Sequence, residues 1–367
     1  SGDTVVVGAP LEDDGGTEAG AAYVFVRGGG SWSQQAKLVA GDAEAGDGFG
    51  WSVALDGDTA VVGAHGENGY AGAAYVFVRS GGIWSQQAKL VAGDAEAYDQ
   101  FGLSVALDGD TALVGANGKS SYAGAAYVFV RSGGSWSQQA RLVAGDAAAD
   151  DWFGHSVALD GDTVLVGAPY EDEGSKDAGA AYVFVRNGGS WNQQAKLMAL
   201  DAKPYDWFGY SVALDGDTVL VGAPYEATGG SAAGAAYVFV RGGGIWGQQD
   251  KLTAADAAAG DQFGGSVALD GDTAVVGAPY EDEGGSVAGA AYVFVRGNGV
   301  WGQQAKLTAG DAEAGDGFGW SVALDGDTAL VGAPYEDDGG SNAGAAYVFV
   351  SGDVLFADGF EPVQPGD

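Results

Sequence analysis

The chain has 367 residues, no cysteine, 68 glycines and a formal net charge of −35, from 50 acidic against 15 basic residues. This charge argues against nucleic acid or an anionic membrane surface as a partner, because both repel a polyanion, and it favours cations. No apolar run is long enough to cross a bilayer as a helix, and the lack of cysteine excludes a disulfide framework.

The sequence is dominated by an internal repeat. The segment Ala-Gly-Ala-Ala-Tyr-Val-Phe-Val recurs with spacings of 52, 52, 55, 55, 55 and 55 residues. A fixed period of this length, filled with short apolar segments, is typical of a propeller or another repeat array. The repeat favours one closed architecture over the two domains that the length alone suggests. Features present in every copy are expected to serve the fold, whereas a single functional site is expected where copies differ.

One copy, residues 49–99, shows the predicted elements in chain order. Residues 49–55 are apolar, and Asp56-Gly57 predicts a tight two-residue hairpin. Residues 59–64 and 73–78 predict two further apolar strands, whereas residues 84–90 alternate apolar and polar, as expected for an outer strand with one solvated face. No segment has a helical period. Four antiparallel strands in each of seven copies predict an all-β, seven-bladed β-propeller.

Strand direction assigns two faces to this propeller. The Asp-Gly hairpins and the glycine-rich turns lie on one face. The loops that join the second and third strands lie on the other face, together with the loops that cross to the next copy. Both of these loop sets are acidic.

The motifs Phe-Gly-x-Ser-Val-Ala, Val-Gly-Ala-Pro and Gly-Ala-Ala-Tyr-Val-Phe recur in this order, and together they resemble FG-GAP repeats. The resemblance covers residues 1–350 and implies the seven-bladed propeller of integrin α-subunits and many bacterial extracellular proteins. Inner strands are predicted to start near residues 49, 101, 153, 208, 263 and 318, and residues 351–367 form a C-terminal tail. The integrin-type calcium loop is not carried over, because residues 55–59 form only a minimal hairpin, too short to wrap Ca²⁺.

Acidic side chains on the loop-bearing face are the candidate metal ligands, because hard carboxylate oxygens suit Ca²⁺. The loops between copies carry two aspartates each: Asp42, Asp47, Asp94, Asp99, Asp146, Asp151, Asp201, Asp206, Asp256, Asp261, Asp311 and Asp316. The facing loops add Glu12, Asp13, Glu171, Asp172, Glu281, Asp282, Glu336 and Asp337. In the alternative interpretation, the aspartate before each Phe-Gly caps a turn and the other acids are solvated.

The second and third copies weaken the calcium hypothesis. Their loops are three residues shorter and read Gly66-Glu67-Asn68 and Gly118-Lys119-Ser120. Bound calcium is therefore expected in only some copies. No organic cofactor is predicted.

A second candidate site lies where the copies differ in aromatic residues. Trp152 and Trp207 precede Phe-Gly at a position where other copies carry glycine or glutamine. The residues nearby in the sequence are His155, Tyr210, Tyr170 and Tyr225. Exposed rings beside acids and amides can stack on sugar rings, as in lectin-like propellers. The alternative is repeat drift at a rim position, since scattered surface aromatics are ordinary.

The two ends break the symmetry as well. Six Phe-Gly strands accompany seven copies of the next two strands, so the first blade is predicted to lack its inner strand. In the tail, residues 354–356 align with an abbreviated outer strand, whereas Asp358-Gly359-Phe360 aligns with the missing inner strand. A tail used as inner strand either closes its own propeller or joins copies into a filament. The third possibility is that the strand lies on a segment that precedes Ser1.

No catalytic constellation is recognisable, because G-x-S-x-G, P-loop and zinc-ligand spacings are all missing from the sequence. The chain is therefore predicted to be a non-enzymatic, secreted binding or structural module that mediates adhesion or matrix interactions. Its expected partners are an extracellular protein, a glycan or copies of itself. The alternatives are a self-assembling extracellular filament subunit, a carbohydrate-binding lectin-like propeller and, least favoured, an enzyme acting on polysaccharide.

Overall fold

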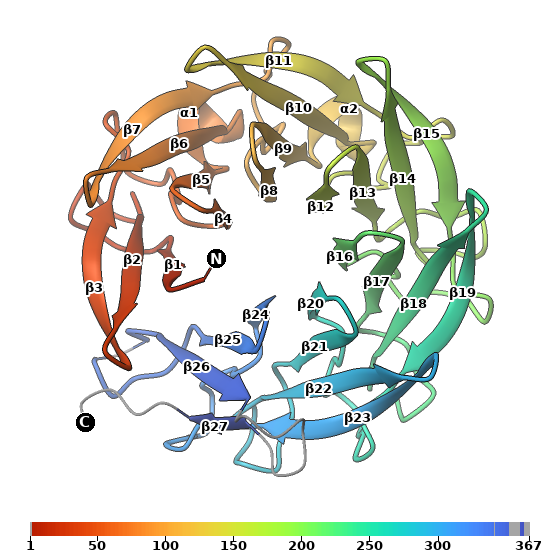
Figure 1. The fold of residues 1–367 in the computed structure, drawn as a ribbon. Coiled ribbons are helices and arrows are strands. Elements are labelled where there is room, and N and C mark those ends of the chain that lie inside the picture. Colours follow the sequence, from red (N-terminus) through yellow and green to blue (C-terminus); the bar gives the residue numbers. More distant parts are fainter. Residues whose placement is uncertain (1, 341, 352–359, 363–367) are drawn as a thin grey trace. The chain divides into compact units, whose positions relative to one another are not determined.

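The computed structural model describes residues 2–340, 342–351 and 360–362. Its fold is all-β, a seven-bladed β-propeller of antiparallel sheets, as the repeats predict (Figure 1). The chain divides into two compact units, here called unit 1 (Ser1–Glu171 with Tyr182–Gln194) and unit 2 (Asp172–Ala181 with Ala195–Asp367).

Consecutive strands of one repeat form each sheet. The first three sheets contain β1 (Thr4–Ala9), β2 (Ala21–Gly28) and β3 (Ser31–Leu38); β4 (Val53–Asp56), β5 (Thr59–Ala64), β6 (Ala73–Ser80) and β7 (Ile83–Leu90); and β8 (Val105–Asp108), β9 (Thr111–Ala116), β10 (Ala125–Ser132) and β11 (Ser135–Leu142). The fourth and fifth contain β12 (Ser156–Asp160), β13 (Thr163–Ala168), β14 (Ala180–Asn187) and β15 (Ser190–Leu197); and β16 (Ser211–Asp215), β17 (Thr218–Ala223), β18 (Ala235–Gly242) and β19 (Ile245–Leu252). The last two contain β20 (Ser266–Asp270), β21 (Thr273–Ala278), β22 (Ala290–Gly297) and β23 (Val300–Leu307); and β24 (Ser321–Asp325), β25 (Thr328–Ala333), β26 (Ala345–Ser351) and β27 (Phe360–Pro362).

Two four-residue helical segments, α1 (Glu67–Tyr70) and α2 (Lys119–Tyr122), occupy the loops that are shorter than the others. The sequence predicted no helix, and these segments are single turns with left-handed residues inside them, such as Asn68 with a φ of 50°. Among the described residues, neither of them has the length or apolar character of a membrane span.

The core lies between successive sheets and is built on the second and third strands. Every residue of β5 is buried, and the same is true of β9, β13 and β17. The phenylalanine of each Phe-Gly pair sits edge-on between two rings of the third strand. Phe263, for example, lies 5.5 Å from Tyr292 and 5.8 Å from Phe294 between ring centroids.

The Phe-Gly segment connects two blades before the inner strand begins. The N–H of Phe49 donates to the carbonyl of Ala19 in the previous repeat, whereas the N–H of Gly50 donates to Gly63 in its own repeat. Regular pairing therefore starts at Val53 in β4, four residues after the predicted start. The backbone turns at Gly50, where φ is 98°.

The outer strands are linked through the Trp-x-Gln-Gln motif. In unit 1 the indole N–H of Trp136 donates to Gln87 of the previous outer strand at 2.8 Å. The neighbouring glutamine acts in the same way, since Gln138 accepts a hydrogen bond from the N–H of Gly93 at 2.9 Å. The tryptophan and glutamine side chains of this motif thus join adjacent outer strands.

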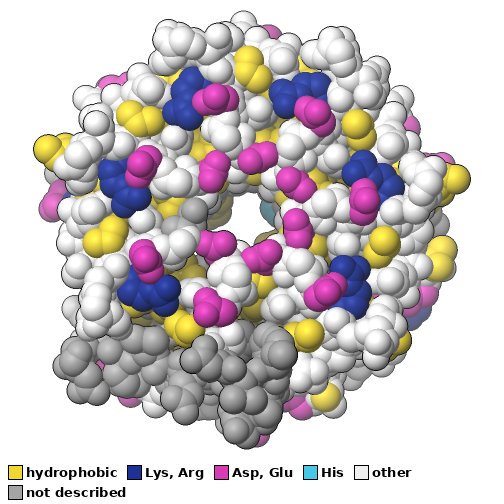
Figure 2. All heavy atoms as spheres, in the orientation of Figure 1, with side chains coloured by type: hydrophobic (Ala, Val, Ile, Leu, Met, Phe, Trp, Pro, Cys, Tyr) yellow, Lys and Arg dark blue, Asp and Glu magenta, His cyan; other side chains and the backbone are white. Residues whose placement is uncertain are grey.

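The second to seventh sheets each present an Asp-Gly hairpin at one end of their strands, here called the hairpin face, and the acidic loops at the other, the loop face. At the hairpin face the arginine that ends the third strand pairs with an aspartate of the hairpin, as in Arg241 and Asp217 at 2.5 Å. Figure 2 shows a face on which basic side chains lie beside acidic ones.

The first sheet has three strands, and the seventh has three full-length strands with the three-residue β27 at its outer edge, so both end blades are incomplete as predicted. β27 pairs antiparallel with β26, with Phe360 opposite Ser351. Phe360 thus belongs to the outer position and not to the inner strand of the alternative alignment. Pro362 ends β27 on an edge, where a missing N–H is tolerated. Residues 354–356, which the sequence aligned with an abbreviated outer strand, lie outside the described residues, as do Asp358 and Gly359.

Replacing Phe263 with alanine should lower the free energy of unfolding by about 3–5 kcal/mol, because it opens a cavity between buried rings. Ile245→Ala is the matched control, since that side chain is 76% exposed. Urea denaturation followed by tryptophan fluorescence measures both. Equal effects of the two substitutions would contradict the assignment of Phe263 to the core.

Candidate functional site

The acidic loops converge on a lysine in each of several repeats. In unit 2, Lys306 extends from β23 and places its Nζ 2.8 Å from Asp256, 3.1 Å from Glu281 and 2.6 Å from Glu283. Asp256 comes from the loop between the fifth and sixth blades, and the two glutamates come from the loop after β21. The carboxylate oxygens of these three residues lie within 4.8 Å of one another. The ammonium group of Lys306 is therefore the cation that these carboxylates share.

The electrostatics agree with this arrangement. Burial, the largest single influence, raises the pKa of Asp256, but the hydrogen bonds from Lys306, Tyr292 and the backbone together with the charge of Lys306 outweigh it, and the net pKa is lowered. Burial disfavours the charged form of Lys306, yet its hydrogen bonds to the three carboxylates raise its pKa. Both groups are thus held in their ionised forms at neutral pH.

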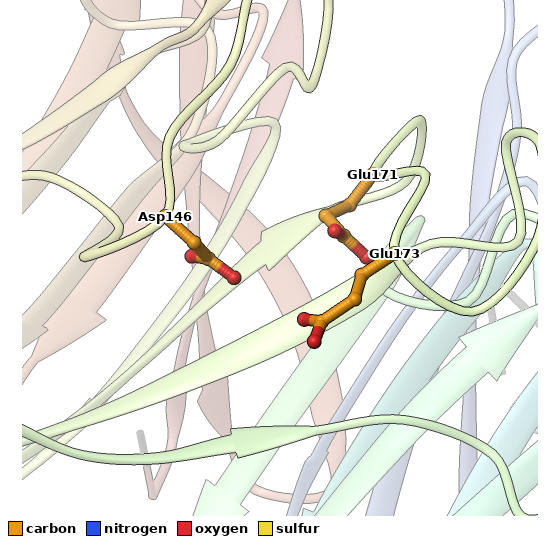
Figure 3. Close-up of side chains that lie close together, drawn as sticks. All are labelled: Asp146, Glu171 and Glu173. Atoms are coloured by element: carbon orange, nitrogen blue, oxygen red, sulfur yellow. The ribbon is translucent and has the colours of Figure 1, made fainter.

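Other repeats contain variations of the same cluster. Lys37 pairs with Glu12, Lys89 with Asp42 and Glu67, Lys196 with Glu173, and Lys251 with Asp201 and Glu226. In the third repeat the basic residue of the outer strand is Arg141, which pairs with Asp94 at 3.2 Å. There the buried Lys119 of α2 adds a second cation, 3.0 Å from Asp99. Figure 3 shows Asp146 and Glu171 of unit 1, which correspond to Asp256 and Glu281.

The second aspartate of each loop between blades has a structural role. Asp47, Asp99, Asp151, Asp206, Asp261 and Asp316 are all buried. Each accepts a hydrogen bond from the N–H three residues earlier, as Asp261 does from Ala258 at 2.7 Å. The alternative interpretation, an aspartate that caps a turn, therefore describes these six residues. Burial raises the pKa of Asp47, Asp206 and Asp261.

The facing loops use several of their acids in the same way. Asp282 accepts a hydrogen bond from the N–H of Val287 at 2.7 Å, and Asp13 and Asp172 accept equivalent bonds. Glu281 and Glu336 are buried and accept from the N–H two residues later. Asp311 accepts from the hydroxyl of Tyr347 at 2.9 Å, and Asp337 is exposed.

The predicted aromatic residues form two separate groups. In unit 1 the ring of Trp152 lies 4.6 Å from Tyr170 and 5.9 Å from His155. In unit 2 the ring of Trp207 lies 4.0 Å from Tyr225 and 6.1 Å from Tyr210. These side chains are half-buried, because they cover a large part of one another's apolar surface.

A more exposed aromatic surface lies in the second repeat and was not predicted. Measured between ring centroids, Trp51 lies 4.6 Å from His65, and His65 lies 6.1 Å from Tyr70. Tyr70 stacks on Tyr98, with 6.1 Å between the centroids and an angle of 11° between the ring planes. Trp51, Tyr70 and Tyr98 are 52%, 46% and 64% exposed. We call these four residues the aromatic ladder; all of them belong to unit 1.

The sequence contained signals for both features that it failed to predict. A lysine or arginine precedes the last leucine of every complete outer strand, at Lys37, Lys89, Arg141, Lys196, Lys251 and Lys306. Trp51 occupies the position of His155 and Tyr210, two residues after phenylalanine. Neither signal shows that the acidic loops meet the outer strand, because this contact depends on the packing of the blades.

Comparison with known families agrees with this geometry. The family model of the FG-GAP repeat matches residues 1–25, 32–77, 84–129, 136–184, 191–239, 246–294 and 301–349. The chain belongs to the FG-GAP repeat family. None of the curated proteins compared with the chain matches it.

Replacing Lys306 with methionine should lower the free energy of unfolding by about 2–3 kcal/mol, because it leaves the buried carboxylate of Glu281 without its cation. The value is set below that of a fully buried pair, since Asp256 and Glu283 are partly exposed to solvent. Chemical denaturation in EDTA measures the change.

The Lys306→Met variant also tests whether calcium competes with the lysine for these carboxylates. Calcium has to displace the ammonium group of Lys306 in the wild-type protein but not in Lys306→Met. We therefore expect added Ca²⁺ to raise the melting temperature of the variant more than that of the wild type. An equal rise in both would contradict competition between lysine and calcium.

Stability should also depend on His155. Burial lowers the pKa of His155 from 6.5 to about 4, so the folded protein binds this proton less tightly than the unfolded chain. The stability that depends on neutral His155 is fully present above pH 6.5. It is lost as the pH falls towards 4, by up to about 3 kcal/mol. Urea titrations of wild type and His155→Phe at several pH values measure it as a difference. Parallel pH profiles of the two proteins would contradict the prediction.

Proposed function

We propose that this chain is a non-enzymatic binding module that acts outside the cell in adhesion or matrix contacts, and that the aromatic ladder is its contact surface. The FG-GAP fold supports a scaffold role, because such a propeller presents many loops on one rigid frame. The exposed fractions of Trp51, Tyr70 and Tyr98 are the observation on which the proposal rests.

The ion pairs and backbone hydrogen bonds that the acidic side chains already make support binding over catalysis. A hydrolase needs a pair of carboxyl groups whose pKa values are pushed apart by their surroundings. Here the carboxylates around Lys306 share one ammonium group, and the buried aspartates accept backbone hydrogen bonds. Both uses stabilise the loops, and the backbone bond to the aspartate recurs from repeat to repeat, as expected of a structural role and not of a single catalytic pair.

The ladder has the properties of a contact surface. Large rings that stay exposed on a folded protein offer much contact area at a small cost in side-chain entropy. The ladder lies where the copies differ: Trp51 is replaced by Leu103 in the next repeat, and Tyr98 by Asp150. A constant frame with variable exposed rings is the pattern expected of a binding surface.

A carbohydrate is the second candidate ligand, beside an extracellular protein. The nearly parallel rings of Tyr70 and Tyr98 support it, since flat exposed rings can lie against the apolar faces of sugar rings. The half-buried group around Trp152 has less free ring surface for this purpose. The ladder is therefore favoured over Trp152 and Trp207 as the lectin-like surface.

The proposal predicts that Trp51→Ala and Tyr98→Ala each weaken binding about tenfold or more, as expected for aromatic hot spots. The probes are a panel of immobilised pyranose oligosaccharides and purified matrix proteins, and the difference in tryptophan fluorescence between the wild type and Trp51→Ala is a second readout. Ile83→Ala is the matched control, because this residue of the same repeat is 73% exposed and is the first residue of β7.

Loss of binding in the Ile83 variant, or equal binding by wild type and both ladder variants, would contradict the role of the ladder. Turnover of any oligosaccharide in the panel would contradict the non-enzymatic assignment.

A further inference from the structure

The loop face of unit 2 is hollowed between two loops. An open hollow of about 390 Å³ lies between the loop that precedes β16 and the loop that follows β17. Its walls include residues 203–206, Tyr225 and Ser231, and all of them belong to unit 2. Small-molecule sites in proteins span about 300–1,000 Å³, so this hollow has room for a small ring-shaped ligand.

The walls of the hollow carry fewer acids than the same loops in other repeats. Ala227, which lines the hollow, stands where the sixth repeat has Asp282. Lys203 stands where two other loops between blades have Glu44 and Glu96. In a chain with a net charge of −35, these exchanges make this part of the loop face less acidic than its counterparts.

The ammonium group of Lys203 is available to a ligand. Its side chain is 55% exposed, and its Nζ lies 3.6 Å from Glu226, which is too far for a hydrogen bond. Glu226 is fully buried, accepts a hydrogen bond from the hydroxyl of Thr228 at 2.6 Å, and lies 3.2 Å from the Nζ of Lys251. Lys251 therefore neutralises Glu226, and Lys203 keeps N–H donors that no described residue satisfies.

Two tyrosine rings and a hydroxyl complete the walls. Tyr205 is 49% exposed, and the ammonium group of Lys176 lies 5.5 Å from its ring centroid. The ring of Tyr225 packs 4.0 Å from that of Trp207, which holds it in place. Ser231 adds an exposed hydroxyl. Such rings offer apolar contact area, and the hydroxyl offers a hydrogen bond, both of which a sugar ring can use.

The backbone of both loops is fixed by hydrogen bonds within the protein. The N–H of Lys203 donates to the carboxylate of Asp206 at 2.8 Å, and the N–H of Tyr225 donates to the carbonyl of Asp206 at 3.4 Å, which joins the two loops. In the facing loop the N–H of Gly234 donates to the carbonyl of Glu226 at 2.9 Å. A wall that is already ordered loses little conformational entropy when a ligand binds.

We propose that this hollow binds a sugar residue that carries a single carboxylate, a uronate. Its carboxylate would accept a charge-assisted hydrogen bond from Lys203, and the apolar face of its ring would lie against the tyrosine rings. A ligand with one negative charge matches the free ammonium group, whereas the net charge of the chain repels a polyanion. The site lies in unit 2 and the aromatic ladder in unit 1, so this proposal does not rest on the ladder.

Isothermal titration calorimetry with methyl D-glucuronide, which has one sugar ring and one carboxylate, tests the site. We expect saturable binding to the wild-type protein. Lys203→Gln should weaken it about tenfold, because it removes the charge-assisted hydrogen bond. Lys203→Arg should bind nearly as well as the wild type, because arginine keeps the charge. Tyr205→Ala should weaken binding about fivefold through the lost ring contact.

Ile245→Ala is the control variant, because this residue of unit 2 is 76% exposed and does not line the hollow. The methyl ester of the glucuronide lacks the charge, and acetate lacks the ring, so both should bind more weakly. Equal binding of either probe, no binding of the glucuronide, or equal binding by the wild type and Lys203→Gln would each overturn the proposal.

Nuclear magnetic resonance locates the bound sugar and separates this site from the ladder. The amide signals of Lys203 and Ser231 should shift when methyl D-glucuronide is added, whereas those of Tyr70 and Tyr98 should not. Shifts at the two ladder residues alone would overturn the proposal, since the sugar would then bind the ladder.

Discussion

The close approach at glycine between the second strand of one repeat and the Phe-Gly segment of the next is the constraint on which the rest of the structure depends. A methyl group added at Gly63 would lie 2.0 Å from the carbonyl oxygen of Gly102, and one at Gly222 would lie 2.0 Å from that of Gly264. Only glycine permits this contact. Because the backbones meet there, each phenylalanine of the Phe-Gly pair reaches the rings of its third strand, and the loops come together at the same end of the sheets.

This packing decides how a chain with a net charge of −35 stays folded. The loops between blades bring carboxylates against the outer strand, where a lysine or arginine neutralises them. Buried aspartates such as Asp261 are stabilised by backbone N–H groups instead. With these acids used internally, the exposed rings of Trp51, Tyr70 and Tyr98 are left as the surface on which the proposed binding role rests.

Much of the fold was predictable because the same turn residues and apolar patterns recur in every copy. Asp56-Gly57 predicts its hairpin from local backbone preference, and the alternation in residues 84–90 predicts the outer strand β7. The start of the inner strand was misplaced by four residues because Phe49 bonds to Ala19 of the previous repeat. Of the candidate site, the aspartate cap was foreseen as an alternative, whereas Lys306 and the aromatic ladder were not.

By itself, then, the sequence determined the number of blades, the order of strands and the two faces, since these follow from period, turn residues and alternation. Only the tertiary structure decided which charges meet and which rings stay exposed. Lys306 and Asp256 are 50 residues apart in the chain, and Trp51 and Tyr98 are joined only through His65 and Tyr70. Contacts of this kind depend on the side-by-side packing of blades, which no local pattern encodes.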